Sequence, residues 1–470
     1  MLLRKAWPWL LATSVIAAGV MVAPSLYRTA VLGSGFMAQL LCSSTFVSHR
    51  DPQAALNDDM TGPGYELLWF FLPHVAREAK RVTVSMFGLG ERTSIFREGL
   101  GCTLVVDGTE DGLRAQADGV FSPLPAPNPD ALWPEGERVD LETLPPGVDR
   151  IALELGVKAA FAEPDSAHPR RTRALVVVHG GRIVAERYAP SFNATMPLIG
   201  WSMTKMAINA LVGIAVQDGK LALTDTALLP EWRGNADPRG EITLDQLLRM
   251  TSGLSFNEDY ADHASDVIQM LFVQGDEAGF AAVKPLEYSP GTHWQYSGGT
   301  SNIIARVLRL RLVDEPNYLR FPRERLFEPL GMRSAVLEPD EAGTFVGSSF
   351  MYASARDWAR LGLLFLRDGV WQRRRLLPEG WVAYSLTPTT EAPDARYGAH
   401  VWLKLPDSPQ FGEPPMPEDA YYMLGYDEQV VVVVPSRDLV IVRLGLTRES
   451  GTWDQARDLA PILQAFPARS

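Results

Sequence analysis

The sequence predicts an α+β fold in which one antiparallel sheet, flanked by helices, lies beside an all-helical lobe. Two β-hairpins are predicted at opposite ends of the chain after residue 150: strands 174–179 and 182–188 flank Gly180-Gly181, and strands 429–434 and 439–444 flank residues 435–438. Helical periodicity lies between them, for example over 244–250, 302–312 and 355–367. Strands at both ends with helices between predict a sheet closed by pairing of the two ends.

The N-terminal segment 1–30 predicts a membrane anchor or a signal segment. Arg4 and Lys5 precede an apolar run over 6–26, and about 20 apolar residues are enough to span a bilayer. Aromatic residues of the kind found at membrane interfaces flank the run: Trp7, Trp9 and Tyr27. Positive charge before the run predicts a cytoplasmic N-terminus and an exported remainder, on the periplasmic or extracellular side. Residues 21–23 are a poor signal-peptidase cleavage site because Pro24 follows them. We therefore favour an uncleaved anchor over a removed signal peptide.

Three further regions are predicted after this segment. Residues 31–120 form an N-terminal α/β extension, with a helix over 65–80 and strands over 82–87 and 103–106. Residues 121–149 contain seven prolines and predict an extended linker or a wrapping segment. Residues 150–470 form the compact domain, which ends in a helix over 454–466.

The chain contains two cysteines, Cys42 and Cys102, both in the predicted extension. Outside the cytosol such a pair can be joined by a disulfide, which would fasten the extension to itself. Two buried free thiols are the alternative, and the sequence favours neither.

Composition excludes some classes of function. The chain is 46% hydrophobic and 21% charged, as in ordinary globular proteins, and its formal net charge is −12. It has no long basic run, so nucleic acid is not an expected partner. The histidines are scattered without helical ligand spacing, so no metal site is predicted: His49, His74, His168, His179, His263, His293 and His400.

Ser202-Met203-Thr204-Lys205 is the strongest candidate for chemistry. A serine hydroxyl needs a base to become a good nucleophile, and a lysine three positions later on a helix lies on the same face. An apolar stripe after Lys205 predicts that helix, which ends at Asp218-Gly219. The chain has only seven lysines, so chance is a weaker explanation for this pair than it would be in an ordinary sequence.

Tyr296 is the best candidate for a second proton-handling group. It lies in 294–302, where glycines on a tight loop precede a predicted helix and would hold the ring at the edge of a cleft. A tyrosine near the Lys205 ammonium can have its pKa lowered enough to act as a base.

These motifs together resemble the serine β-lactamase and penicillin-binding superfamily, on the side of class C enzymes, esterases and 6-aminohexanoate-dimer hydrolases. Ser202–Lys205 matches the family's Ser-x-x-Lys, and Tyr296-Ser297-Gly298 stands where the family has Tyr-x-Asn. Three further segments are similar to family landmarks: 242–254 with its Thr-Ser-Gly-Leu, 327–332 and 353–362. The resemblance covers about residues 173–466 and implies a β-lactamase/transpeptidase-like fold.

The sequence departs from the family pattern at two places. Gly298 replaces the asparagine of the tyrosine motif, and 423–429 contains no basic residue where the family usually has Lys-Thr-Gly. That basic residue helps to hold a substrate carboxylate in β-lactamases. Asp427 and Glu428 instead bring negative charge, so we expect a substrate that is neutral there or carries an amine.

The resemblance implies acyl transfer to a small ester, amide or peptide substrate, with no cofactor. Ser202 attacks the carbonyl carbon, while Lys205 and Tyr296 share the proton transfers. The backbone N–H groups of Ser202 and Tyr426 would form the oxyanion hole. Further candidates for substrate binding are Gly298, Gly425, Asp427, His293 and His400.

Other functions remain open. One is a D-Ala-D-Ala peptidase activity on cell-wall peptides, and another is a membrane-anchored binding protein that kept the fold and lost the chemistry. A nucleophile elbow at 200–204 with His400 in a triad is disfavoured, because Thr204 stands where that motif needs glycine. The sequence does not predict an oligomeric state.

Overall fold

A computed structural model describes residues 24–467 except 63, 122–127, 235, 313–314, 407–415 and 450. Its central sheet is antiparallel, with the strand order β12-β13-β14-β5-β6. The bounds are β5 (Thr172–His179), β6 (Arg182–Tyr188), β12 (Tyr421–Gly425), β13 (Gln429–Val434) and β14 (Leu439–Gly445). Both predicted hairpins are present, and β14 pairs with β5, so the predicted closure of the sheet by the two ends of the domain is confirmed.

Helices cover both faces of this sheet because its strands are apolar on both sides. Helix α12 (Ala355–Leu366) lies on one face, where Gly362 allows it to approach Val431 and Val440 closely. Helices α4 (Arg150–Ala160) and α14 (Gln455–Leu463) lie on the other face and share a core with the alternate strand residues. The last of these confirms the helix predicted over 454–466.

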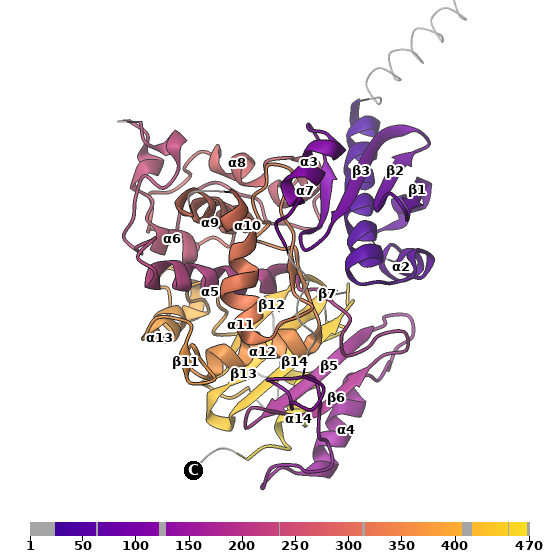
Figure 1. The fold of residues 1–470 in the computed structure, drawn as a ribbon, viewed down its shortest axis with the longest axis vertical. Coiled ribbons are helices and arrows are strands. Elements are labelled where there is room, and N and C mark those ends of the chain that lie inside the picture. Colours follow the sequence, from indigo (N-terminus) through magenta and orange to yellow (C-terminus); the bar gives the residue numbers. More distant parts are fainter. Residues whose placement is uncertain are drawn as a thin grey trace, which may run out of the picture.

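A helical lobe lies beside the sheet (Figure 1). Its helices include α5 (Thr204–Gln217), α6 (Leu244–Leu248), α7 (Asp266–Val273), α8 (Glu277–Ala282), α9 (Gly298–Arg311), α10 (Glu315–Pro322), α11 (Glu328–Leu330) and α13 (Trp381–Leu386). Short strands form two further small sheets, in the orders β7-β9-β8 and β10-β11: β7 (Leu198–Ile199), β8 (Val336–Leu337), β9 (Met351–Ala353), β10 (Val370–Trp371) and β11 (Arg374–Arg375).

The segment before residue 120 forms a second, smaller sheet in the order β1-β2-β3-β4. The elements are β1 (Phe71–Ala76), β2 (Arg81–Met86), β3 (Leu89–Arg97) and β4 (Gly101–Val105), with helices α2 (Pro52–Asp59) and α3 (Glu110–Ala117). The strands predicted over 82–87 and 103–106 correspond to β2 and β4.

The helix predicted over 65–80 is wrong. A short 3₁₀ turn over Glu66–Phe70 is followed directly by β1. Pro73 disfavours a helix interior, and β1 is an edge strand, where proline is tolerated. Phe71 fixes the strand by packing against Gly33 of the preceding helix.

That preceding helix, over Pro24–Val47, is the one described helix long and apolar enough to cross a membrane, although composition alone is weak evidence. In its most apolar stretch 72% is buried within the protein, as in the core helix of a soluble domain. The anchor predicted over 6–26 overlaps this helix only at residues 24–26, and the rest of it lies outside the described residues.

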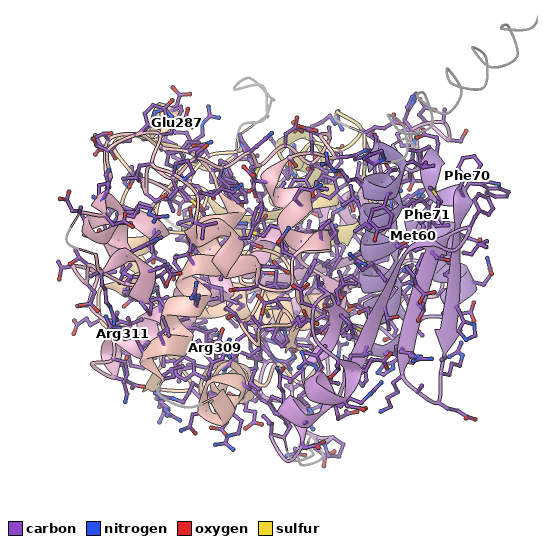
Figure 2. The ribbon with its side chains drawn as sticks, turned by 90° about the horizontal axis from the view of Figure 1, so that it is seen from above. Met60, Phe70, Phe71, Glu287, Arg309 and Arg311 are labelled. Atoms are coloured by element: carbon purple, nitrogen blue, oxygen red, sulfur yellow. A yellow bond between two sulfur atoms is a disulfide. The ribbon has the colours of Figure 1, made fainter. Side chains whose placement is uncertain are left out.

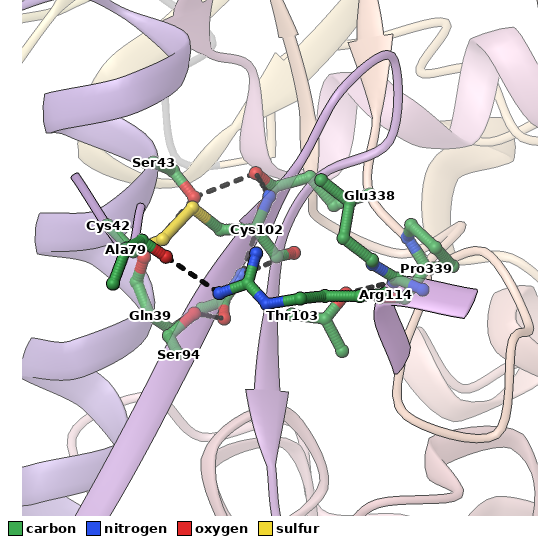
Figure 3. Close-up of a disulfide and its surroundings, with 11 residues drawn as sticks. Gln39, Cys42, Ser43, Ala79, Ser94, Cys102, Thr103, Arg114, Glu338 and Pro339 are labelled. Carbon is green, nitrogen blue, oxygen red and sulfur yellow. Dashed lines mark hydrogen bonds between the residues drawn. A yellow bond between two sulfur atoms is a disulfide. The ribbon is translucent and has the colours of Figure 1, made fainter. Parts of the chain in front are cut away.

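Figure 3 shows how the extension is fastened to itself and to the domain. Cys42 and Cys102 form a disulfide between the N-terminal helix and β4. The buried carboxylate of Glu338, from the domain, accepts hydrogen bonds from Gln39 Nε2 (2.9 Å), Ser43 Oγ (2.8 Å) and Cys102 N (2.7 Å). Three residues later, Glu341 accepts hydrogen bonds from the backbone N–H groups of residues 106–108.

The described part of the proline-rich segment wraps over the domain. Arg360 of α12 donates hydrogen bonds to the carbonyl oxygens of Pro134 (3.0 Å) and Gly136 (2.7 Å). Arg356 donates to the carbonyl oxygen of Glu137 (2.8 Å) and pairs with Glu186 of β6. The segment is therefore held by charged side chains of a buried helix.

Candidate active site

A strained turn delivers Ser202 to the start of α5. The backbone of Trp201 has a φ of 49°, a conformation that residues other than glycine rarely adopt. Such a conformation costs about 1–3 kcal/mol. Gly200 precedes Trp201 because a Cβ there would collide with the ring of Trp358. The 3₁₀ turn Trp201–Met203 then leads into α5, so Ser202 lies in the first turn of helical structure, where backbone N–H groups lack partners within the helix.

Lys205 lies against the Ser202 hydroxyl. Its Nζ is 3.0 Å from Ser202 Oγ and 3.0 Å from the carbonyl oxygen of Ser348. The lysine side chain is buried, whereas Ser202 is partly exposed. Burial lowers the pKa of Lys205 to about 8, with the negative charge of Glu258 opposing the shift. A substantial fraction of neutral amine near neutral pH suits Lys205 to accept a proton from Ser202.

Tyr296 completes the cluster that the sequence predicts. Its hydroxyl lies near enough to Ser202 and Trp402 for both side chains to lower its pKa, and its ring lies 4.8 Å from Lys205 Nζ. The ring stacks on Trp402 at 5.3 Å between centroids. The expectation of a lowered pKa is wrong, because burial and the neighbouring Glu258 raise the pKa of Tyr296 instead. A phenol that stays protonated is suited to donate a hydrogen bond or a proton.

Glu258 belongs to the same cluster and was missed by sequence reasoning. Its Oε2 accepts a hydrogen bond of 2.6 Å from the backbone N–H of Gly298, the residue that replaces the family's asparagine. Its Oε1 is buried and has no hydrogen-bond partner among the described residues. Burial raises the pKa of Glu258 to about 7, while Lys205 opposes the shift. A signal existed: Glu258 follows the Thr-Ser-Gly-Leu landmark by four positions.

Two histidines do not occupy the places expected of substrate-binding residues. His400 is buried, with Nδ1 2.9 Å from the carbonyl oxygen of Lys205 and Nε2 3.2 Å from Ser301 Oγ. Burial, together with the positive charge of Lys205, lowers the pKa of His400 to about 3. The imidazole is therefore neutral and binds the backbone of α5 at the carbonyl oxygen of Lys205. His293 is exposed and stacks on Tyr288 at 3.9 Å between centroids. Neither geometry fits a Ser202–His400 triad.

The end of β12 lies beside the turn that carries Ser202. A Cβ on Gly425 would stand 2.1 Å from the carbonyl oxygen of Gly200, so only glycine allows this approach. The ring of Tyr426 lies 5.6 Å from that of Trp201 and stacks on Tyr260 at 4.7 Å. The two backbone segments expected to form an oxyanion hole are therefore neighbours.

Asp427 does not bring charge to Ser202, contrary to expectation. It adopts a φ of 59° and lines a small cavity of about 40 Å³ between the domain and the extension, together with Asp59, Arg173 and Arg448. Its Oδ1 lies 4.0 Å from Arg448 Nε, and burial raises the pKa of its carboxyl to about 6.

A groove of about 410 Å³ opens at Tyr296 and supplies the negative charge instead. Its lining includes four carboxylates: Glu258, Asp259, Asp266 and Glu287. Asp266 is paired with Lys284, whereas Asp259 and Glu287 are exposed. The groove is therefore acidic, as expected, but its charge comes from these four carboxylates and not from Asp427 and Glu428.

Comparisons with known proteins identify the family and the fold of this chain. The beta-lactamase family model matches residues 157–465. A 6-aminohexanoate-dimer hydrolase of Paenarthrobacter ureafaciens is 26% identical over 223 residues, which are 45% of this chain and 56% of that protein. The match thus spans little more than half of that relative's length.

Two solved structures share the fold. One is EstCE1, a hydrolase with promiscuous acyltransferase activity, with a TM-score of 0.52 and 16% identity over 66% of this chain and 99% of that one. The other is a family VIII carboxylesterase, with a TM-score of 0.51 and 13% identity over 68% of this chain and 98% of that one. At these identities the likeness concerns the fold alone.

Proposed function

The chain belongs to the beta-lactamase family, within the serine β-lactamase and penicillin-binding superfamily, and from that premise we propose that it is a serine hydrolase acting through an acyl-enzyme on Ser202. The bond cleaved is an ester or an amide of a small substrate. The observation that carries the proposal is the 3.0 Å contact between Lys205 Nζ and Ser202 Oγ, made by a buried lysine whose pKa is lowered.

The proposed reaction proceeds in two steps. Lys205 accepts the proton of Ser202 as Oγ bonds to the carbonyl carbon, and the oxyanion is held by the backbone N–H groups of Ser202 and Tyr426, each worth about 3 kcal/mol. Tyr296 donates its proton to the leaving group and is reprotonated from Lys205. Water then attacks the acyl-enzyme, gives up a proton to the same pair and releases the acid from Ser202.

The substrate class is proposed from the charge of the groove. A substrate carboxylate would meet the carboxylates of Asp259 and Glu287. An ammonium group, or a neutral polar group that donates a hydrogen bond, would instead find acceptors there, including the unpaired Glu258 Oε1. These contacts favour amine-bearing or neutral substrates over carboxylate-bearing ones such as penicillins and D-Ala-D-Ala peptides.

The location is also a proposal. The apolar run 6–26 anchors the chain, with Arg4 and Lys5 on the cytoplasmic side and the domain exported. The disulfide between Cys42 and Cys102 supports an oxidising compartment. Protease added to sealed cells or spheroplasts should degrade the domain if this orientation holds.

The activity is tested by covalent labelling of the full chain. A fluorophosphonate probe should modify Ser202, and the Ser202→Ala variant should lose both labelling and hydrolysis of a p-nitrophenyl ester. Lys205→Ala should slow hydrolysis by about 100-fold or more, because general-base catalysis typically contributes that much. Lys220→Ala, an exposed lysine after the same helix, is the matched control and should keep full activity.

Three results would contradict the proposal. An intact wild-type chain that shows no labelling would indicate a binding protein. Undiminished labelling of Ser202→Ala would place the nucleophile elsewhere. Equal rates for the Lys205→Ala and Lys220→Ala variants would remove the lysine from the mechanism.

Substrate charge is tested with p-nitrophenyl esters of equal acyl length that end in an ammonium, a neutral or a carboxylate group. We expect the lowest KM for the ammonium ester, and added salt should weaken this preference because the exposed groove carboxylates are screened. Glu287→Gln should raise KM for the ammonium ester alone, whereas Glu91→Gln, an exposed glutamate of β3, should leave KM unchanged. A lowest KM for the carboxylate ester would contradict the assigned substrate class.

A further inference from the structure

The extension exposes a set of large apolar side chains that no described part of the chain covers. We name this set the apolar face: Tyr27, Trp69, Phe70, Leu72, Phe87 and Leu89. Trp69 is 87% exposed and Phe87 is 69% exposed, the highest values among the large apolar residues apart from Ile151 at 70%. Soluble proteins seldom leave so many such side chains together without a partner.

Contacts within the extension gather these residues at one end of the small sheet. Phe70 and Phe87 lie 6.2 Å apart between ring centroids, across the end at which β2 turns into β3. Phe70 and Leu72 are two positions apart on either side of Phe71, which points inward against the N-terminal helix. The side chains on either side of Phe71 therefore face outward.

The same contacts place the apolar face at the start of the N-terminal helix. Phe71 packs against Gly33, and Gly90 of β3 approaches Ala30 and Val31. Tyr27 precedes Ala30 by three residues, which is about 4.5 Å along a helix axis. Figure 2 looks down on this end of the extension, with Phe70 at its outer edge and Phe71 turned toward the helix.

The sequence before this helix indicates what covers the apolar face. The apolar run 6–26 ends where the described helix begins, so a chain anchored by that run brings the apolar face to the bilayer surface. Trp, Tyr and Phe are the residues that favour the layer between lipid headgroups and acyl chains. In a chain anchored in this way, the bilayer lies against the apolar face and leaves little space for a second protein to bind there.

We propose that the apolar face of the extension inserts into the interfacial layer of a lipid bilayer and fixes the orientation of the hydrolase domain on the membrane. This goes beyond the proposed hydrolase activity and rests on the proposed anchor. The small sheet then acts as a rigid base between the bilayer and the domain, to which it is fastened through Glu338 and Glu341.

The test uses the full chain in vesicles of phosphatidylcholine and phosphatidylglycerol. A Phe87→Cys variant carries an environment-sensitive fluorophore, and Leu155→Cys is the matched control. Leu155 is 62% exposed on α4, which Figure 1 places at the opposite end of the molecule from β1 and β2. Spin-labelled lipids should quench most of the Phe87 fluorescence and leave the Leu155 fluorescence unchanged. Adding Trp69→Asp and Phe70→Asp to the Phe87→Cys variant should reduce the quenching.

The outcomes separate the apolar face from the anchor. A chain that floats with the vesicles after an alkaline wash, but shows equal quenching at both positions, keeps the anchor and overturns the docking face. A chain that does not float overturns both. Protection of the Phe87 fluorophore that appears only at high protein concentration, without lipid quenching, would assign the apolar face to a second copy of the chain and overturn the membrane assignment.

Discussion

The charge on Lys205 is set by two effects that oppose each other, its own burial and the neighbouring Glu258. Burial lowers the pKa of Lys205, and the carboxylate of Glu258 pulls it back toward its ordinary value. Glu258 is held in turn by the backbone N–H of Gly298, where an added Cβ would lie 3.1 Å from both carboxylate oxygens and crowd them. The glycine in the tyrosine motif and the glutamate after the Thr-Ser-Gly-Leu landmark therefore form one arrangement.

The pH dependence of hydrolysis follows from this pair. Activity that needs the neutral amine of Lys205 should rise with pH through about 8, the pKa of the buried lysine. Glu258→Gln removes the charge that raises this pKa, so the rise in kcat/KM should shift to lower pH. Glu287→Gln, in the same groove but exposed, should change KM and leave the position of the rise unchanged. A rise that stays fixed in Glu258→Gln would show that Lys205 is not the titrating group.

Individual residues differed in how far the sequence could place them. Ser202 and Lys205 are three positions apart on one helix, so local geometry alone predicts their contact. Tyr296 required the resemblance to a family, since it is distant in sequence. Glu258 was missed although it follows the Thr-Ser-Gly-Leu landmark, and His400 was assigned to substrate binding, because a single acid or histidine has no defined role until the fold places it beside Lys205.

Among the elements, the end of β12 and the turn before α5 depend on each other. Gly425 and Gly200 meet backbone to backbone, and this contact holds the end of β12 against the turn that carries Ser202. The family resemblance predicted that the end of β12 lies near Ser202. The sequence alone could not predict the direction in which the Asp427 side chain points after the strand. Its left-handed backbone turns the side chain toward the extension.

A methyl group added at this contact should impair the site. Gly425→Ala puts a Cβ 2.1 Å from the Gly200 carbonyl oxygen, so one backbone segment must move. We expect a stability loss of about 1–3 kcal/mol and a fall in kcat larger than the change in KM. Gly234→Ala, at a glycine with no atoms within 4 Å of the added Cβ, is the control for thermal unfolding and kinetics. Unchanged kcat in Gly425→Ala would separate this contact from catalysis.

The misassigned element, 65–80, shows why apolar runs are ambiguous. Leu67 to Val75 contains enough apolar residues for either a helix or a strand, and the choice depends on packing against Gly33. The two hairpins of the domain were easier to predict from the sequence. Gly180-Gly181 and the polar 435–438 turn mark where the chain must reverse direction.

Across the whole molecule, the extension contributes directly to the surroundings of the site. Tyr65 lies near enough to Tyr426 to influence the pKa of its hydroxyl, and Arg448 lies over the Tyr65 ring at 3.8 Å. The small sheet is fastened on its other side by Glu338 and Glu341. Composition predicted a separate extension, but these long-range contacts have no local sequence signal.

Docking of the extension should weaken as pH rises. Burial raises the pKa of the Glu338 carboxyl from 4.5 to about 8. Because the folded state holds this proton more tightly, its contribution to stability is complete below pH 4.5 and is lost as pH rises through about 8. Amide exchange in β4 should therefore accelerate between about pH 4.5 and pH 8 by more than the intrinsic chemistry predicts, and this excess should level off above pH 8.

The control for this effect replaces the carboxyl with a group that does not titrate. Glu338→Gln should remove most of the excess acceleration, although the buried Asp340, whose pKa is raised to about 7, leaves a remainder. Glu91→Gln, exposed on β3, should behave as the wild type. Identical exchange profiles in the wild type, Glu338→Gln and Glu91→Gln would show that titration of Glu338 does not control the docking of the extension.

The pairing of β5 with β14 also sets the order in which the chain can mature. Residues 174–178 pair with β6 on one side, but their partners on the other side are residues 440–444, so the central sheet cannot close until nearly the whole chain has been made. The extension closes its disulfide over a separation of 60 residues, with partners available much earlier. A polypeptide that emerges N-terminus first can thus close the disulfide of the extension while the central sheet still lacks its last strands.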